Sequence, residues 1–283
     1  MFRPVLHNFY CYSKEDIDYV NNLRYIKKIE IFCNKIKSHK IHRRRERFIV
    51  LDLVGEPEFL RTPNSVIIEN SNLFDLIFAW DVDILNKCNN SVKMLLGTSW
   101  VLPCQIDNVI NNKKFEISFL CGSKMKSDGH VLRRIIWDRQ MDIKTKKSFF
   151  RSGQKDIVSI DNNPVLDPHP YAKYTLFNSK FHICIENTRC YNYFSEKIID
   201  CFITKTIPIY NGCLNIGEYF DSRGFFIANT DDEIVDICNS LDNSTYERMI
   251  PYVNENYNRC KEYYPTVCRR IFNMINNISI SWR

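Results

Sequence analysis

The sequence predicts an α/β fold that contains two Rossmann-like domains, and two observations lead to this prediction. In both halves of the chain, apolar runs of strand length alternate with segments of helical spacing, which is typical of parallel βαβ units. A polar, proline-containing stretch at residues 101–114 separates the two series. We therefore expect a first domain at residues 1–110 and a second domain with a helical tail at residues 111–283.

The first half begins with a helical pattern and continues with apolar runs. Residues 13–40 carry Ile, Val, Leu and Phe at helical spacing, with Ser13 as a candidate N-cap. The basic run "IHRRRER" predicts a solvated turn before a strand, with a phosphate-binding patch as the alternative. "FIVLDLV" at residues 48–54 is typical of a strand buried on both faces. "SVIIE", "FDLIFAW" and "VKMLLG" follow at short intervals and indicate a small α/β sheet.

The second half repeats the alternation. We expect strands at "FEISFLCGS", "FHICIE", "IPIYNG" and "GFFIA", and helices at "GHVLRRIIWDRQM", "SEKIIDCFITKT" and "DDEIVDICNSL". From about residue 244 the tail is mostly helical. Ligands of such sheets bind at the carboxyl ends of strands, and "ENTRCYNYFSEK" at residues 186–197 follows one of those ends.

Composition limits the possible functions. A net charge of +6 fits an anionic ligand such as a nucleotide, but it is too small for bulk nucleic-acid binding. No apolar run is long enough for a transmembrane helix, and the first residues lack a secretory pattern. The 12 cysteines include no CxxC pair, which favours reduced core cysteines in a cytoplasmic protein over a zinc site.

The stretch "ENTRCYNYFSEK" combines groups that bind an anion and a sugar. Ser195 can cap a helix that begins at Glu196, and the free backbone N–H groups of that first turn favour an anion. Lys197 is unfavourable at this end of a helix unless an anion compensates it. Glu196 can accept hydrogen bonds from ribose hydroxyls, while Tyr191 and Tyr193 offer flat phenol rings. The alternative is a helix-stabilising carboxylate beside a solvated lysine.

Polar residues also follow two other predicted strands. After "FEISFLCGS", Arg133 and Arg134 lie on a helix, and a guanidinium binds phosphate bidentately. His130 can contact a ligand there or be structural. In the first half, Glu56 lies just past a buried strand, as a general base or a turn residue.

The pattern "WDVD" raises the question of a metal site. It resembles an acidic metal triplet, but in a two-domain architecture we expect Asp81 and Asp83 to cap a helix or turn.

The segment "FHICIENTRCYNYFSEKIIDCFITKTIPIYNG" resembles the signature of the α-1,3-fucosyltransferases, glycosyltransferase family 10. That signature reads approximately F-x-L-x-F-E-N-S, a spacer with tyrosine, T-E-K, an amphipathic helix and P-I/V-x-x-G. Thr188 and Ser195 stand where the family carries serine and threonine, and the resemblance extends over about residues 114–240. The residues in register are Glu186, Asn187, Tyr193, Glu196, Lys197, Pro208 and Gly212.

The first half resembles the family more distantly. "VGEPEF" and "NSNLFDLIFAWDVDIL" are similar to its T-G-E-N and N-F-D-x-A-I-G-F-D regions, which places Glu56 on the family's proposed catalytic base. "GHVLRR" falls where the family carries an arginine that grips the donor diphosphate, and Arg133 is the closest match. The chain departs from the family at "CGSK", where S-N-P/W is usual.

The resemblance implies a GT-B fold with two Rossmann-like domains facing a cleft, an inverting mechanism and GDP-β-L-fucose as donor. Glu56 would take a proton from the hydroxyl of a glycan or glycoconjugate acceptor. Arg133 and Lys197 would stabilise the leaving diphosphate, and because cations fill this role, no metal or other cofactor is expected. The remaining donor-binding residues would be Glu196 at the ribose, and Glu186, Asn187 and Tyr193 around the diphosphate and sugar.

Soluble bacterial or viral members of the family, which lack the membrane anchor of animal members, are the most similar in kind. A cytoplasmic enzyme of glycan biosynthesis or protein glycosylation is therefore expected. Three alternatives stay open: the same fold with another nucleotide sugar, a catalytically silent carbohydrate-binding or scaffold protein, and, more distantly, a nucleic-acid binder. In the last case aromatic side chains would be interleaved with the basic run, and they are not.

Overall fold

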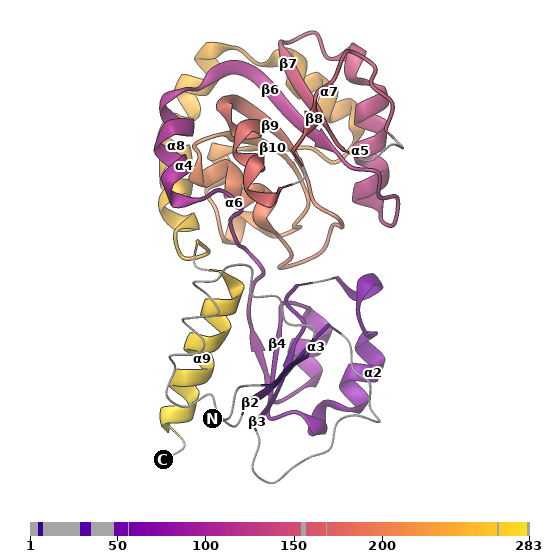
Figure 1. Ribbon diagram of the computed structural model, residues 1–283, viewed down its shortest axis with the longest axis vertical. Coiled ribbons are helices and arrows are strands. Elements are labelled where there is room, and N and C mark those ends of the chain that lie inside the picture. The colour runs from indigo at the N-terminus through magenta and orange to yellow at the C-terminus, as the bar shows by residue number, and fades with distance from the viewer. Residues whose placement is uncertain are drawn as a thin grey trace. The chain divides into compact units, whose positions relative to one another are not determined.

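The computed structural model describes residues 5–7, 29–34, 48–55, 57–153, 157–167, 169–264 and 266–281 (Figure 1). The chain separates into two compact units. The first comprises Met1–Leu96, Tyr191–Tyr193 and Pro265–Arg283, and the second comprises Gly97–Cys190 and Phe194–Tyr264. Each unit is built around a parallel β-sheet, as the alternation of strands and helices predicted.

The first unit contains a five-stranded sheet whose strands follow the order of the chain, β1-β2-β3-β4-β5. Every described pair is parallel, and Val50 of β3 lies opposite Leu76 of β4. The strands are β1 (Val5–His7), β2 (Ile29–Cys33), β3 (Phe48–Asp52), β4 (Leu76–Ala79) and β5 (Ser91–Lys93), and the helices between the last three are α2 (Asn64–Glu69) and α3 (Val82–Lys87), with 3₁₀ turns η3 (Glu58–Leu60) and η4 (Ser71–Leu73).

The predicted buried strand at residues 48–54 is confirmed by β3, but the predicted helix at residues 13–40 is wrong over residues 29–33. Residues 29–33 form β2, because this alternately β-branched segment pairs with β3 and buries Ile31 and Phe32 in the core. The rest of the predicted helix and the run "IHRRRER" lie outside the described residues. Of the later apolar runs, "SVIIE" lies in α2 and "FDLIFAW" forms β4.

The C-terminal helix α9 (Val267–Ser281) belongs to the first unit. Its buried residues Cys268, Ile271, Phe272 and Ile275 recur at helical spacing, so they form one apolar face. Arg270 fixes its start by donating from Nη1 to the carbonyl oxygen of Leu95 at 3.0 Å. Figure 1 shows α9 on the side of the first sheet away from α2.

The second unit contains a six-stranded parallel sheet in the order β11-β10-β9-β6-β7-β8. Chain order therefore runs outward in both directions from the β6–β9 pair, as in the Rossmann fold. Its strands are β6 (Lys114–Cys121), β7 (Lys147–Ser152), β8 (Val165–Leu166), β9 (Ser179–Ile185), β10 (Ile207–Asn211) and β11 (Phe226–Ile227).

Helices and 3₁₀ turns complete the second unit. Burial of Phe119, Trp137, Phe181 and Ile209 in one cluster ties α5 and the later helices to β6, β9 and β10. The helices are α4 (Pro103–Asn111), α5 (Asp128–Asp138), α6 (Glu196–Ile203), α7 (Asp231–Ser240) and α8 (Asn243–Cys260), and the turns are η5 (Gln140–Asp142), η6 (Pro170–Asn178), η7 (Ile216–Glu218) and η8 (Ser222–Gly224).

The stretch at residues 101–114, predicted to be a linker, instead contains α4. Pro103 occupies the first turn, where a missing N–H is harmless, and Gln105 Oε1 accepts a hydrogen bond from the N–H of Leu102 at 3.0 Å. Ile106 and Val109 are buried and α4 packs against η6. The first crossing between the units accordingly lies between Leu96 and Gly97, not at residues 110 and 111.

The C-terminal helical segment also belongs to a different unit from the one that the sequence predicted. Residues 265–281 group with the first unit, although the sequence placed them in the second domain. Within the described ranges, none of the helices combines the length and the apolar character needed to cross a lipid bilayer.

Candidate functional site

The reversal of strand order in the second sheet marks where a ligand is expected. β6 ends at Cys121 and β9 at Ile185, and these strands are neighbours in the sheet. The loops that follow them lead in opposite directions, so a crevice forms outside their carboxyl ends. α5 and α6 begin at this edge, where their first backbone N–H groups favour an anion.

A glycine lets the two loops touch. A Cβ at Gly129, in the first turn of α5, would lie 1.8 Å from the carbonyl oxygen of Glu186. The N–H of Gly129 donates instead to the carbonyl oxygen of Asn187 at 3.2 Å. Position 129 therefore excludes any side chain.

The contact brings Arg133 to the loop after β9. Its Nη2 donates to Asn187 Oδ1 at 2.6 Å and its Nε to the carbonyl oxygen of Gly129 at 3.1 Å. These two bonds hold the guanidinium at the edge of the sheet, so the structure brings Arg133 and Asn187 together.

Glu186 contacts the residues at the start of α6 through its buried carboxylate. Its side chain is fully buried and accepts hydrogen bonds from Ser195 N at 2.8 Å and Ser195 Oγ at 2.6 Å. Lys197 Nζ lies 3.5 Å from its Oε2. A Cβ at Gly212 would lie 2.5 Å from Glu186 Cγ, so this glycine leaves room for the carboxylate. Glu186 thus positions Ser195 and Lys197, and its burial keeps it from touching a ligand directly.

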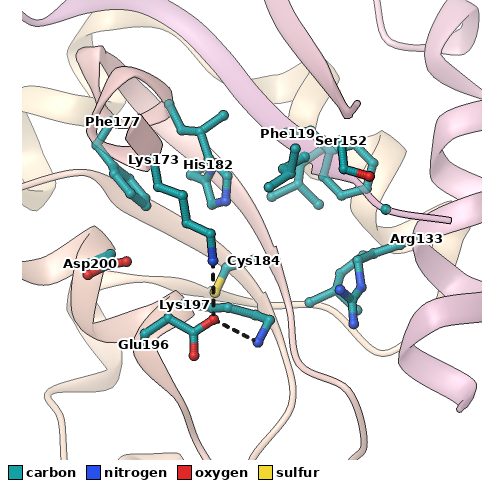
Figure 2. A pocket seen from close by; sticks show the side chains of 15 residues that line it. Phe119, Arg133, Ser152, Lys173, Phe177, His182, Cys184, Glu196, Lys197 and Asp200 are labelled. Carbon is teal, nitrogen blue, oxygen red and sulfur yellow. Dashed lines mark hydrogen bonds and ion pairs between the residues drawn. The ribbon is translucent and has the colours of Figure 1, made fainter. Parts of the chain in front are cut away.

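Glu196 lies between two lysines at the N-terminus of α6 (Figure 2). Its Oε1 is 3.2 Å from Lys197 Nζ and 3.6 Å from Lys173 Nζ. Burial raises the pKa of Glu196, but the charges of Lys197 and Lys173 outweigh burial and lower it to about 2. Glu196 is therefore an ionised acceptor at neutral pH.

Lys197 is held in place by acidic neighbours. Burial opposes its charge, yet Glu196 and Glu186 raise the pKa of Lys197 above its usual value. Ser195 Oγ accepts a hydrogen bond from Lys197 Nζ at 3.0 Å, and the same hydroxyl caps α6 by accepting from the backbone N–H of Lys197. The predicted cap at Ser195 is confirmed, and Lys197 remains charged beside the helix terminus.

These side chains border a cavity of about 140 Å³ within the second unit. The cavity is lined from β6, β7, β9, α5, α6 and η6, and the labelled residues are Phe119, Arg133, Ser152, Lys173, Phe177, His182, Cys184, Glu196, Lys197 and Asp200 (Figure 2).

Three lining residues escaped the sequence analysis. Lys173 lies over the Trp100 ring, with Nζ 4.5 Å from the ring centre. Burial, with the charge of Glu196, raises the pKa of Asp200 to about 7. Burial lowers the pKa of His182 to about 3, so this ring is neutral and shares a hydrogen bond of 2.8 Å with Ser118. A signal existed for Asp200, a carboxylate inside the apolar run "IIDCF" four residues after Glu196.

Tyr193 is placed differently from the other predicted donor ligands. Tyr193 is 2% exposed, and its ring packs against Trp80 with the ring centres 4.9 Å apart and the planes tilted by 47°. Asn192 Nδ2 donates to the carbonyl oxygen of Trp80 at 3.1 Å. Both tyrosine and tryptophan belong to the first unit. Tyr193 is not among the residues that line the cavity, whereas Tyr191 is 56% exposed.

The basic residues around α5 divide into two kinds. His130 is buried, and burial together with the charges of Arg133 and Lys124 lowers its pKa to about 4. It bonds to Ser127 Oγ, so it is a neutral structural histidine. Arg134 does not line the cavity, which leaves Arg133 as the arginine of this site.

In the first unit, Glu56 lies outside the described residues. Nearby Asp52 ends β3 with both carboxylate oxygens bonded, Oδ1 by Val54 N at 2.9 Å and Oδ2 by Cys33 Sγ at 3.4 Å. Burial raises the pKa of Asp52 to about 6.

Asp81 is the N-cap of α3, where it accepts from Asp83 N at 2.9 Å and from Ile84 N at 3.4 Å. The predicted cap is confirmed for Asp81, whereas Asp83 lies in the first turn of α3 and its Oδ1 is 3.4 Å from Lys87 Nζ. Across the described part of the chain, no three His, Cys, Asp or Glu side chains are grouped so as to hold a metal ion.

No protein-family model matches the chain, but one curated protein matches a short part of it. The α-(1,3)-fucosyltransferase FucT of Helicobacter pylori is 46% identical over 46 residues, which make up 16% of this chain and 10% of that enzyme. The match therefore spans about a tenth of the relative's length, and it confirms the resemblance inferred from the motif.

Solved structures match over nearly the whole chain. A crystal structure of an α1,3-fucosyltransferase matches 95% of this chain and 90% of its own chain, with a TM-score of 0.57 and 17% sequence identity. A structure of an α1,3-fucosyltransferase with GDP-fucose has a TM-score of 0.54 and 17% identity, and the match covers 94% of this chain and 90% of that one. The Anabaena protein HepE in complex with UDP-glucose also has a TM-score of 0.57, with 11% sequence identity, and the match covers 84% of this chain and 73% of that one. Together with the two parallel sheets, these similarities show the GT-B glycosyltransferase fold, as predicted.

Proposed function

We propose that this protein is an inverting glycosyltransferase that moves L-fucose from GDP-fucose to a hydroxyl group of a glycan. The observation that carries the proposal is that Arg133 and Lys197 line the same cavity at the switch point of the second sheet. The FucT similarity supports the choice of enzyme class, and the matched fucosyltransferase structures with GDP and with GDP-fucose support the choice of donor.

The donor would lie along the edge of the second sheet. Arg133 and Lys197, with the N–H groups at the start of α6, would hold the diphosphate. Glu196, ionised because two lysines flank it, would accept hydrogen bonds from the ribose hydroxyls. Asn187 orients Arg133, and Glu186 orients Lys197, so these two residues would act by positioning.

The chemical step would join groups from both halves of the chain. Glu56 would take the proton from the acceptor hydroxyl while its oxygen attacks the anomeric carbon from the face opposite GDP. The bond to GDP breaks through an oxocarbenium-like transition state, and negative charge collects on the diphosphate. Arg133 and Lys197 would stabilise that charge, an electrostatic contribution that is often the largest in such sites. In this scheme the two cations fill the place of a metal ion.

A second candidate keeps the fold and changes the donor. HepE with UDP-glucose matches the chain as well as the fucosyltransferases do by TM-score. Affinities measured by calorimetry for GDP, GDP-fucose, UDP and UDP-glucose separate the two candidates. We expect binding of both guanine nucleotides and little of the uridine nucleotides. Tight binding of UDP-glucose without a response to GDP would replace the proposed donor.

Catalysis itself is tested with donor and a panel of glycans. Donor hydrolysis or transfer supports an enzyme, and its absence despite donor binding supports a silent carbohydrate-binding protein. The same assay in EDTA tests the metal, since we expect undiminished transfer. Loss of transfer in EDTA that manganese restores would contradict the metal-free scheme.

A further inference from the structure

A carboxylate inside the cavity has one oxygen without a partner. Asp200 lines the cavity and is 1% exposed. Its Oδ1 accepts hydrogen bonds from Ser99 Oγ and from Trp100 N, each at 2.8 Å. Among the residues that the structure describes, no hydrogen bond or ion pair reaches Oδ2. Oδ2 is not closed off from the cavity, so a ligand that carries N–H or O–H groups can bond to it there.

The position of Asp200 indicates which part of a ligand would meet it. Asp200 lies one helical turn after Glu196, so both carboxylates project from the same face of α6. Figure 2 shows Arg133, Lys197, Glu196 and Asp200 following one another across the cavity. A nucleoside diphosphate has its parts in the same order, with the diphosphate first, the ribose next and the base last.

We propose that Asp200 recognises the base of the donor nucleotide through Oδ2 and selects guanine; this inference rests on the proposed function. Guanine carries two adjacent donors, N1–H and the 2-amino group, and a carboxylate oxygen has the lone pairs to accept from both. Beside them guanine carries the O6 acceptor, and Lys173, whose Nζ is 3.6 Å from Glu196 Oε1, is the cation on that side of the cavity.

Other bases do not match this pair of groups. Uracil presents one N–H between two carbonyl oxygens, and adenine presents an amino group beside an acceptor nitrogen. Each would place an acceptor against the Asp200 carboxylate, which is unfavourable in a buried site.

The test compares diphosphates that differ at one position of the base. Inosine diphosphate lacks the 2-amino group, and xanthosine diphosphate has a carbonyl oxygen there. Calorimetry on the wild-type protein should show GDP binding about 10- to 100-fold tighter than inosine diphosphate, the range expected for one hydrogen bond to a charged group. Equal affinities for these two ligands would overturn the inference without any variant.

The variant Asp200→Asn should reverse the order of affinities for GDP and xanthosine diphosphate, a result that partial unfolding cannot produce. Asparagine keeps Oδ1 as the acceptor for Ser99 and Trp100, and it turns an NH₂ group toward the base. We expect Asp200→Asn to bind xanthosine diphosphate more tightly than GDP, opposite to the wild type. Thermal unfolding checks that the variant is folded.

The matched control is Ser99→Ala, which removes a bond to Oδ1 and leaves Oδ2 unchanged. It should keep the wild-type order of affinities. If a folded Asp200→Asn variant still prefers GDP over xanthosine diphosphate, another group recognises the base and the inference is overturned, while the proposed function stands. If the wild-type protein binds no guanine nucleotide, the proposed function itself fails.

Discussion

The two units use the same kind of sheet in different strand orders. In the first unit the described strands follow chain order from β1 to β5, whereas in the second the order reverses at β6 and β9. Right-handed crossovers that advance in one direction place their helices on one face of a sheet, and α9 lies on the side away from α2. A reversal sends the crossovers to both faces and opens a crevice among the loops of the same sheet.

The side chains at the strand ends follow this difference. At the carboxyl ends of β3 and β4, Asp52 and Asp81 are both engaged by neighbouring groups of their own unit. At the ends of β6 and β9, charged groups line a cavity, and the Asp200 carboxylate keeps one oxygen unbonded by described residues. The comparison teaches that a reversal of strand order, and not a parallel sheet alone, gathers charged side chains around a cavity in the part of the chain that the structure describes.

The largest expected effect belongs to the first unit and concerns rate alone. Glu56→Gln keeps size and shape but removes the proposed base, so transfer should slow by about 10²–10⁴-fold. GDP affinity should change little, because the donor groups lie in the other unit. Single-turnover transfer and GDP calorimetry measure the two quantities. A variant that transfers at the wild-type rate would make Glu56 a turn residue and remove the first unit's part in the comparison.

The next effect tests the contact between the loops of the second unit. Gly129→Ala puts a Cβ where the backbone oxygen of Glu186 lies, and relieving that overlap should cost about 3 kcal/mol of unfolding free energy, the upper end for overpacking. GDP binding should fall as well, because Arg133 loses its position. Urea unfolding and GDP calorimetry measure both.

The matched control is Gly217→Ala, since nothing lies within 4 Å of a Cβ at Gly217. It should leave unfolding and GDP binding near wild type. Equal behaviour of the two alanine variants would show that α5 and the loop after β9 do not meet as described.

A smaller effect is expected when one cation of the second unit is removed. Lys197→Ala deletes a charge-assisted contact worth about 1.5–3 kcal/mol, so GDP should bind about 10- to 100-fold more weakly. Turnover should fall too, because the contact strengthens as charge develops on the leaving group. The control is Lys180→Ala, which removes a lysine paired with Glu247 outside the cavity. Unchanged GDP affinity in Lys197→Ala would move the donor away from α6.

The smallest effect is a pH dependence that separates Asp200 from Asp52. Guanine needs the ionised carboxylate, and Asp200 in the free protein has a pKa of about 7, so GDP affinity should fall about tenfold from pH 8 to pH 6. Asp200→Asn should lack this decrease, while Asp52→Asn should retain it, because both Asp52 oxygens are bonded within the first unit. The phosphate groups of GDP titrate equally against all three proteins, so the comparison cancels them.

The groups that face Asp200 do not supply the same titration. Glu196 is ionised throughout, with a pKa of about 2, and Cys260 and Tyr264 stay protonated with pKa values of about 12. Lys173 contributes a charge that favours the carboxylate. A wild-type affinity that is flat between pH 6 and pH 8, relative to Asp200→Asn, would contradict the assignment.

The same pKa shift has a consequence for stability, with the opposite sign. Because the folded-state pKa of Asp200 is raised, its contribution is fully present below the ordinary value of 3.8 and is lost as pH rises through about 7. Urea unfolding without ligand should therefore show wild-type stability falling between about pH 4 and pH 7, and a shallower fall in Asp200→Asn.

Sequence reasoning identified the elements of the second unit because their patterns are strong. β9, α6 and β10 match the predicted segments, and Ser195 caps α6 as expected. It failed where tertiary contacts decide: residues 29–33 become β2 because β3 is there to pair with them, and α4 forms because η6 covers Ile106 and Val109. No local pattern carries that information.

The site was predictable in its charges but not in their roles. The spacing of Glu196 and Lys197 after a strand indicated an anion site, and the structure brings them together with Arg133. That Glu186 is a buried organiser depends on Ser195 and Gly212 surrounding it. Lys173 and Asp200 joined the site through contacts with Glu196 and Trp100, which lie far apart along the chain.

The chain passes between the units at four places, after residues 96, 190, 193 and 264. This routing governs how the protein can be recombined with a relative. A chimera joined at a single point would separate α9 from the sheet it packs with, and would leave Tyr193 facing a foreign residue in place of Trp80. An exchange of the first unit must therefore transplant three segments together. One of them, Tyr191–Tyr193, lies in the loop between β9 and α6, so an exchange of the first unit would also alter a loop whose two ends belong to the second unit.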